Sequence, residues 1–304
     1  MNKITKKQNE PISIERLKAQ RKIYRQAKYI AYSSLMLFVI LVVVGNIVKI
    51  WLGSNVNFVN AFAAYGAIAA ILKLFFSVWE SSKKKSAASV QQLFDTYLYE
   101  MPWKKTWGTR PSQEFVNHVS RNEPDSKLKD WYEPLIEKAD HNVGVLLCQL
   151  ENMRYDELLK TMFYRSINIL FYIYIAIVLV FEYFYYQESV SAYMLHTILP
   201  ISPIVVWYGL LMRSRRKELE LRGKFDALTE ASWNTVKSRN SISMRRLEEI
   251  QDALYAYRRE VNAVPDAYYN WHRDMLEGIA YKSSKDRLLE LGIIKQEEYA
   301  VQSK

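Results

Sequence analysis

The sequence has little cysteine, and it carries no recognisable signature of a catalytic or metal site. Cys148 is the only cysteine among 304 residues, so no intramolecular disulfide and no cysteine-based zinc site can form. A glycine-rich phosphate loop, a dinucleotide fingerprint and an HExxH pair are all missing. The four histidines are scattered, and the carboxylates show no spacing typical of acid–base chemistry. We therefore predict no metal, no cofactor and no enzymatic activity.

Long apolar runs are abundant. Four runs are each near the ~20 residues that cross a hydrocarbon core of ~30 Å. They are Tyr29–Leu52, Phe58–Trp79, Ile167–Tyr186 and Tyr193–Met212. Because the first two and the last two are separated by only a few residues, the sequence predicts two transmembrane hairpins.

The basic residues lie almost entirely on one side of these hairpins. The short connectors contain no Lys or Arg, whereas residues 1–28, 80–166 and 213–304 carry nine, thirteen and eighteen. The positive-inside rule then places both termini and the central segment in the cytoplasm. The net charge of +10 suits a surface beside anionic lipid, and it would equally favour a phosphate-bearing ligand.

No segment has a convincing strand pattern, so we predict an all-α membrane protein. Its four transmembrane helices form two hairpins, and a mainly helical cytosolic domain is built from the central insert and the C-terminal tail. The predicted segments are a basic amphipathic helix (1–28), hairpin 1 (29–79), a helical insert (80–166), hairpin 2 (167–212) and a helical tail (213–304). The basic helix would lie on the inner leaflet or pack on the cytosolic domain.

Several cytosolic helices are expected from periodicity and from proline positions. They cover 89–100, 112–121 and 130–138, a long helix that begins near Val143 and continues into the third span, and a short helix over 266–280. In the tail, a seam for a partner helix is formed by Leu247, Ile250, Leu254, Tyr257 and Val261.

Two features inside the spans suggest surfaces for assembly. The second span has small residues three or four apart, which let another helix approach closely: Ala63, Gly66, Ala67 and Ala70. The fourth span contains Pro200 and Pro203, which kink a helix unless neighbouring groups bond the freed carbonyls.

Three ionisable residues lie within the spans, Lys49, Lys73 and Glu182. Each lies near a helix end, where snorkelling makes a charge tolerable. We favour snorkelling, or a Lys49–Glu182 pair at the interface, over an ion pathway.

Aromatic residues alternate with arginine and lysine in two parts of the predicted cytosolic domain. Bases stack on aromatic rings and phosphates accept bidentate bonds from arginine, so these groups are candidates for a nucleotide site. Aromatic residues at helical spacing are nevertheless more often part of a core. The candidates are Trp103, Trp107 and Arg110 in the insert, and Arg258, Arg259, Tyr268 and Trp271 in the tail.

Four stretches together resemble the SMODS-associated four-transmembrane effector family of bacterial anti-phage signalling systems (CBASS). QNEPISIERLKAQRKIYRQAK (8–28) is similar to the family's opening, and LFDTYLYEMPW (93–103) to its Phe-Asp helix ending in Pro-Trp. WYEPL and CQLENMRYDELL resemble its Trp-Tyr and Cys-Gln-x-x-Asn stretches, with Tyr155 where a Trp is expected. The tail stretch 245–277 resembles its Arg, Ile-Gln-Asp, Arg, Pro and Tyr pattern.

This resemblance implies a receptor and an executioner in one chain of the bacterial inner membrane. A partner cyclic nucleotide synthase would supply a cyclic di- or trinucleotide, and no nucleic acid polymer would bind. The cytosolic domain would bind the messenger, and copies of the chain would oligomerise and disrupt the membrane, causing abortive infection. The resemblance assigns no ligand-binding residue. The alternatives are an ion channel or transporter not gated by nucleotides, and a membrane-anchored enzyme.

Overall fold

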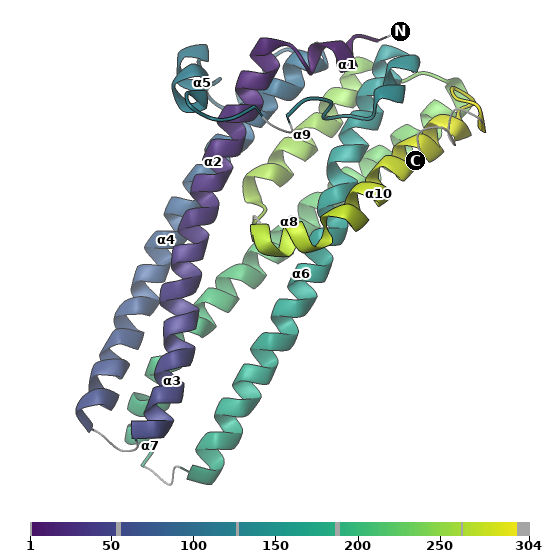
Figure 1. The fold of residues 1–304 in the computed structure, drawn as a ribbon. Coiled ribbons are helices and arrows are strands. Elements are labelled where there is room, and N and C mark those ends of the chain that lie inside the picture. The colour runs from purple at the N-terminus through teal and green to yellow at the C-terminus, as the bar shows by residue number, and fades with distance from the viewer. Residues whose placement is uncertain (1, 53–55, 126–127, 186–188, 263, 297–304) are drawn as a thin grey trace. The chain divides into compact units, whose positions relative to one another are not determined.

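The computed structural model describes residues 2–52, 56–125, 128–185, 189–262 and 264–296, and these ranges contain helices and no strand (Figure 1). The prediction of an all-α protein is confirmed. The α-helices are α1 (Ile4–Lys7), α2 (Pro11–Leu35), α3 (Leu41–Leu52), α4 (Val56–Leu98), α5 (Gln113–Ser120), α6 (His141–Tyr185), α7 (Val190–Tyr193), α8 (Leu199–Arg239), α9 (Met244–Glu260) and α10 (Asp266–Glu290). Short 3-10 helices are η2 (Lys105–Trp107) and η3 (Pro134–Lys138), and π-helical turns are η1 (Met36–Ile40) and η4 (Met194–Ile198).

Helix lengths differ from expectation at three places. The helix expected over 89–100 is the end of α4, which continues through its basic run without a break. The helix expected over 130–138 is only η3, because the residue before Pro134 is kept out of the α region and Asp130 has a positive φ of 54°. Helix α10 extends to Glu290 rather than ending near 280. The long helix expected from near Val143 is confirmed as α6.

Side-chain caps and proline fix several helix ends. The hydroxyl of Ser112 accepts a hydrogen bond from the Phe115 amide at the start of α5, and Ser243 accepts one from the Arg246 amide at the start of α9. Pro265 stands immediately before α10, where its missing N–H costs nothing. These local signals explain why α9 and α10 are separate helices.

The chain divides into two compact units. Unit 1 comprises residues 1–25, 83–161 and 217–304, and unit 2 comprises residues 26–82 and 162–216. Helices α2, α4, α6 and α8 contribute residues to both units.

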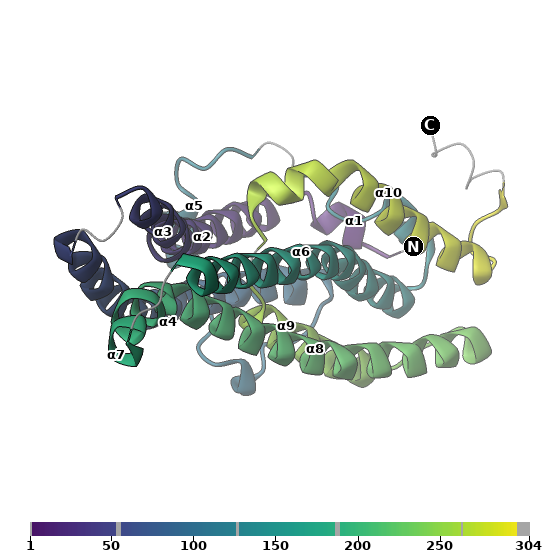
Figure 2. The same ribbon diagram turned by 90° about the horizontal axis from the view of Figure 1, so that it is seen from below.

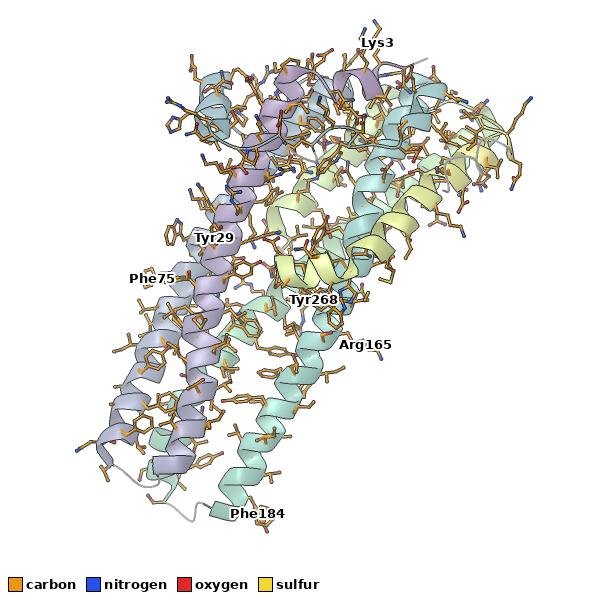
Figure 3. The ribbon with its side chains drawn as sticks, in the orientation of Figure 1. Lys3, Tyr29, Phe75, Arg165, Phe184 and Tyr268 are labelled. Carbon is orange, nitrogen blue, oxygen red and sulfur yellow. The ribbon has the colours of Figure 1, made fainter. Side chains whose placement is uncertain are left out.

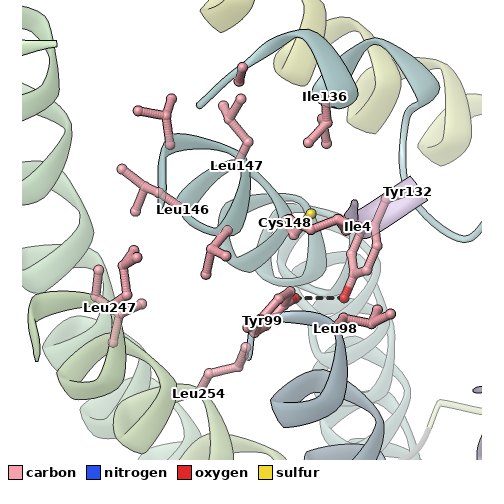
Figure 4. Packing of buried hydrophobic residues seen from close by; sticks show 14 of the residues in the cluster. Ile4, Leu98, Tyr99, Tyr132, Ile136, Leu146, Leu147, Cys148, Leu247 and Leu254 are labelled. Carbon is pink, nitrogen blue, oxygen red and sulfur yellow. Dashed lines mark hydrogen bonds between the residues drawn. The ribbon is translucent and has the colours of Figure 1, made fainter. Parts of the chain in front are cut away.

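Unit 1 has a contiguous apolar core drawn from the ends of the long helices and from α9. Figure 4 shows its centre, where Leu98 of α4, Leu146 of α6 and Leu254 of α9 pack together. The hydroxyls of Tyr99 and Tyr132 are 2.8 Å apart in this core, so their polar ends are satisfied where the rings are buried. Helix α9 lies beside α8, as Figure 2 also shows, and Arg246 Nε donates to Ser232 Oγ at 3.1 Å.

Unit 2 exposes apolar side chains on much of its surface, as a structure surrounded by lipid would. In Figure 3, Phe75 of α4 and Phe184 of α6 point away from their helices. Within the described residues, three helices are long and apolar enough to cross a membrane, and they cover Pro11–Lys49, Val56–Leu98 and His141–Val180. Each exceeds the ~20 residues that a bilayer core requires, so only a part of each would lie in hydrocarbon.

The fourth predicted span, 193–212, is not among these three helices. It falls across α7, η4 and α8, and the side chains of residues 195 and 196 lie outside the described part of the structure. The four-span count therefore stays a prediction.

Candidate functional site

The interior of unit 1 contains a cluster of polar side chains that joins three helices. We call Gln92 and Asp95 of α4, Gln149 of α6, and Gln251 and Arg258 of α9 the polar cluster; all five are buried. Nε2 of Gln251 donates to Gln92 Oε1 at 2.8 Å and to Asp95 Oδ2 at 3.0 Å. Nε2 of Gln149 donates to Gln251 Oε1 at 2.9 Å. Gln251 is thus the bridge that connects α4, α6 and α9.

An ion pair between Arg258 and Asp95 closes the cluster. Nη1 of Arg258 donates to Asp95 Oδ2, and the Tyr132 hydroxyl lies 3.5 Å from Asp95 Oδ1. Burial opposes the charge of Arg258 and is the largest single effect, but the carboxylate of Asp95, its hydrogen bond and the nearby tyrosines together raise the pKa of Arg258. Burial also raises the pKa of Tyr132 well above its usual value, so the phenol stays protonated.

Three polar atoms of the cluster have no hydrogen-bond partner among the described residues. They are Nη2 of Arg258, Nε2 of Gln92 and Oε1 of Gln149. Buried polar groups are almost always paired, because an unpaired one costs about 1–3 kcal/mol. Two donors and one acceptor are thus left open within one network.

The sequence contained a signal for this cluster that the periodicity argument missed. Gln251 and Arg258 lie four and eleven residues after Leu247, so they share the buried face of α9 with Leu247 and Leu254. A polar residue on an apolar stripe is the informative exception. The three glutamines, however, are on different helices, so only the fold could reveal that they meet.

Trp103 and Trp107, the two tryptophans predicted to stack on a base, contact other side chains of the protein. Trp107 is 5% exposed, lies edge-on to Trp103 with ring centroids 5.4 Å apart, and also contacts Tyr255. Its Nε1 donates to Asp252 Oδ1 at 2.7 Å, and Lys104 Nζ donates to the other oxygen at 2.9 Å. These contacts attach the loop after α4 to α9.

The other predicted ligand residues are dispersed. Arg110 is exposed, and the Arg259 guanidinium lies 5.5 Å from the Tyr255 ring centre. On α10, Tyr268 stacks on His272 of its own helix, while Trp271 is 82% exposed. The structure therefore brings Arg259 near the tryptophan pair, through Tyr255, and places Tyr268 and Trp271 on a separate helix.

A second buried polar region joins α6 to α10. Ser284 Oγ donates to Glu151 Oε2 at 3.0 Å. Burial raises the pKa of Glu151 to about 8, and the carboxylate of Glu133 adds to this rise while the Ser284 hydrogen bond opposes it. Burial likewise raises the pKa of Glu133. Within the described ranges, no group of three or more His, Cys, Asp or Glu side chains could hold a metal ion.

In unit 2, part of the predicted assembly surface contacts the chain itself. Gly66 and Ala63 are buried, and a Cβ added to Gly66 would lie 2.8 Å from Pro200 Cα. Ala67 and Ala70 are half-buried. The small residue at position 66 thus allows α4 and the start of α8 to approach closely, and assembly between copies through this face stays a prediction.

The prolines of α8 are accommodated without ending the helix. Pro203 lies inside α8 and cannot donate to the Leu199 carbonyl, but the Ser202 hydroxyl donates to that oxygen at 2.7 Å. Pro200 is the second residue of α8 and directly follows the π-helical turn η4 and Leu199, so the chain is helical on both sides of this proline.

Two of the three ionisable residues that the sequence places within the spans are buried. Lys73 Nζ donates to Ser34 Oγ at 2.6 Å, and Lys49 is 2% exposed. The side chain of Glu182 falls outside the described part of the structure, so the Lys49–Glu182 pair stays a prediction.

Comparison with known families accounts for this combination of a compact helical unit and an apolar helical unit. The family model described as the SMODS-associating 4TM effector domain matches residues 2–284, nearly the whole chain. The chain belongs to this family. Membership implies a CBASS-type membrane effector and confirms the resemblance found in the sequence. No curated protein and no solved structure matches the chain.

Proposed function

We propose that this family member is an anti-phage effector in which unit 1 binds a cyclic oligonucleotide and unit 2 disrupts the inner membrane. The observation that carries the proposal is the family match across both units. Binding would favour an assembled state of several copies over the resting state, because a ligand shifts an equilibrium by its differential affinity for the two states.

The properties of the two units support this division of labour. Unit 1 has a well-packed core, buried polar groups and most of the basic residues, which suits the recognition of an anionic ligand. Unit 2 exposes apolar side chains and pairs its polar ones internally, which suits contact with lipid. A cyclic nucleotide synthase would be the functional partner that makes the ligand.

The test is dye release from liposomes of inner-membrane composition that carry the full-length protein. Cyclic di-AMP, cyclic GMP–AMP, cyclic di-GMP and cyclic tri-AMP are added one at a time, each with its linear counterpart as the matched control. We expect one cyclic compound to release the dye, with a lag that shortens as the protein density rises because copies must assemble.

The alternatives give different results. A constitutive channel or transporter would leak without any nucleotide, and a membrane-anchored enzyme would convert the nucleotide without releasing dye. The absence of release with every cyclic compound, from correctly inserted protein, would refute the proposal.

A further inference from the structure

The polar cluster of unit 1 is unusual because it is strongly charged, fully buried and incompletely bonded. Asp95 accepts hydrogen bonds from Arg258 and Gln251, so this carboxylate is well satisfied. Arg258, by contrast, uses Nη1 for Asp95 while Nη2 has no partner among the described residues. The guanidinium of Arg258 therefore has an open donor, Nη2, beside Nη1, which is bonded to the carboxylate of Asp95.

The open atoms define the chemistry of a missing partner. A guanidinium offers parallel N–H groups that match two oxygens of a phosphate, and a single carboxylate oxygen uses only one of them here. The open donor of Gln92 and the open acceptor of Gln149 match the acceptor and donor groups on the edge of a nucleobase. A phosphodiester that carries bases offers both kinds of group in one molecule.

Asp95 stands where such a phosphate would bind. Two anions beside one arginine repel each other strongly in a buried site. A ligand phosphate would therefore bind Arg258 in exchange for Asp95 rather than in addition to it. Because Asp95 is on α4 and Arg258 is on α9, this exchange would replace a direct contact between the two helices.

We propose that the polar cluster is an anion-exchange site, in which a phosphodiester group of the ligand displaces Asp95 from Arg258 and the amides of Gln92 and Gln149 bind a base edge. This inference rests on the proposed function for the identity of the ligand. Asp95 then acts as a built-in competitor that keeps the site closed until a stronger anion arrives. The competing explanation, that buried water satisfies the three open atoms, predicts no response of the cluster to anions.

The experiment compares four variants of the full-length protein. Arg258→Lys keeps the positive charge but removes the two parallel N–H groups of the guanidinium. Gln92→Met removes the open donor with little change in the shape of the side chain. Asp95→Asn removes the competing charge. Arg245→Lys is the matched control, since Arg245 is also on α9 but its side chain is 91% exposed. Binding of each cyclic nucleotide and of inorganic pyrophosphate is measured by titration, together with the thermal unfolding midpoint.

The variants are expected to change affinity in opposite directions. Arg258→Lys and Gln92→Met should weaken nucleotide binding about tenfold or more, Asp95→Asn should tighten it about fivefold, and Arg245→Lys should leave it unchanged. Gln92→Met decides the matter if a charge variant fails to fold. It removes the open donor and also the acceptor of Gln251 Nε2, which keeps its second bond to Asp95 Oδ2, so the unfolding midpoint should fall only slightly.

The outcomes separate this inference from the proposed function. Nucleotide-triggered dye release with equal affinity in all four variants would overturn the exchange site and leave the effector function intact. If no cyclic nucleotide acts on the wild type, the effector function fails, and pyrophosphate decides the inference alone. A pyrophosphate-dependent rise in the unfolding midpoint that Arg258→Lys abolishes would support it, and no rise in the wild type would overturn it.

Discussion

Replacing Gly66 with alanine should destabilise unit 2 where α4 meets the start of α8. The added Cβ would lie 2.8 Å from Pro200 Cα and 2.9 Å from the Leu199 carbonyl carbon, and closer still to the carbonyl oxygen. Carbon atoms normally stay about 3.5–4.0 Å apart, so the two backbones would have to separate by about 1 Å. These neighbours are backbone atoms and cannot rotate away.

The magnitude follows from two opposing effects. Forcing extra atoms into a packed site costs about 1–3 kcal/mol, while removing glycine from a helix interior gains at most about 1 kcal/mol. We therefore expect Gly66→Ala to lower the free energy of unfolding by about 1–2 kcal/mol. Gly209→Ala is the matched control in α8, because a Cβ there meets nothing within 4 Å and only the favourable effect remains.

The assay is unfolding of the detergent-solubilised protein by increasing SDS, followed by far-ultraviolet circular dichroism. Gly66→Ala should shift the midpoint to lower SDS, and Gly209→Ala should leave it unchanged or raise it. An equal rise in both variants would refute the close crossing of α4 and α8. Lost dye release with an unchanged midpoint would instead assign Gly66 to contacts between copies.

Two further predictions concern unit 1. Trp107→Phe keeps an aromatic ring but removes the hydrogen-bond donor to Asp252, so the free energy of unfolding, measured by thermal unfolding, should fall by about 1 kcal/mol. An unchanged free energy of unfolding would mean that this hydrogen bond is not formed in solution. The pKa of Glu151 is about 8 in the folded state against about 4.5 in the unfolded state, so between these values the folded state binds more protons. The free energy of unfolding should therefore fall as the pH rises from about 4.5 to about 8, by at most about 1.4 kcal/mol per pH unit. Glu151→Gln should remove that slope in chemical unfolding measured at several pH values, and an identical slope in the variant would contradict the assignment.

Much of the helical architecture could be predicted from the sequence because it depends on local properties. Apolar runs of membrane length identified the segments that became α3, the first half of α4 and the end of α6. The spacing after Leu247 identified the helix that became α9, and Pro265 separated it from the helix that follows. The end of α10 was missed although the sequence carries a stop signal for it: Gly292 follows the helix with a positive φ of 67°, and Leu288 is held by the core of unit 1.

The candidate site was harder to predict because its chemistry depends on tertiary contacts. Tryptophans interleaved with basic residues have the same pattern whether they bind a ligand or form a core, and Trp107 proved to be buried with its N–H donated to Asp252. Arg258 was identified, but its partner Asp95 lies 163 residues away in sequence. Neither periodicity nor composition brings these two residues together.

The distribution of unpaired polar groups supports the proposal that unit 1 binds the ligand. In hydrocarbon no solvent can replace a lost hydrogen bond, so polar groups must be paired within the protein. Unit 2 follows this rule where it is described: Asn46 donates to the Tyr174 hydroxyl at 3.1 Å, and Ser202 bonds the carbonyl that Pro203 leaves free. The three open atoms of the polar cluster, on Arg258, Gln92 and Gln149, belong to unit 1. Replacing a buried ion pair such as Arg258–Asp95 by apolar residues is often neutral or stabilising, so stability alone does not explain why unit 1 keeps it. The proposed binding role would explain it, because donors left open in the resting state would be available to form new bonds with the ligand.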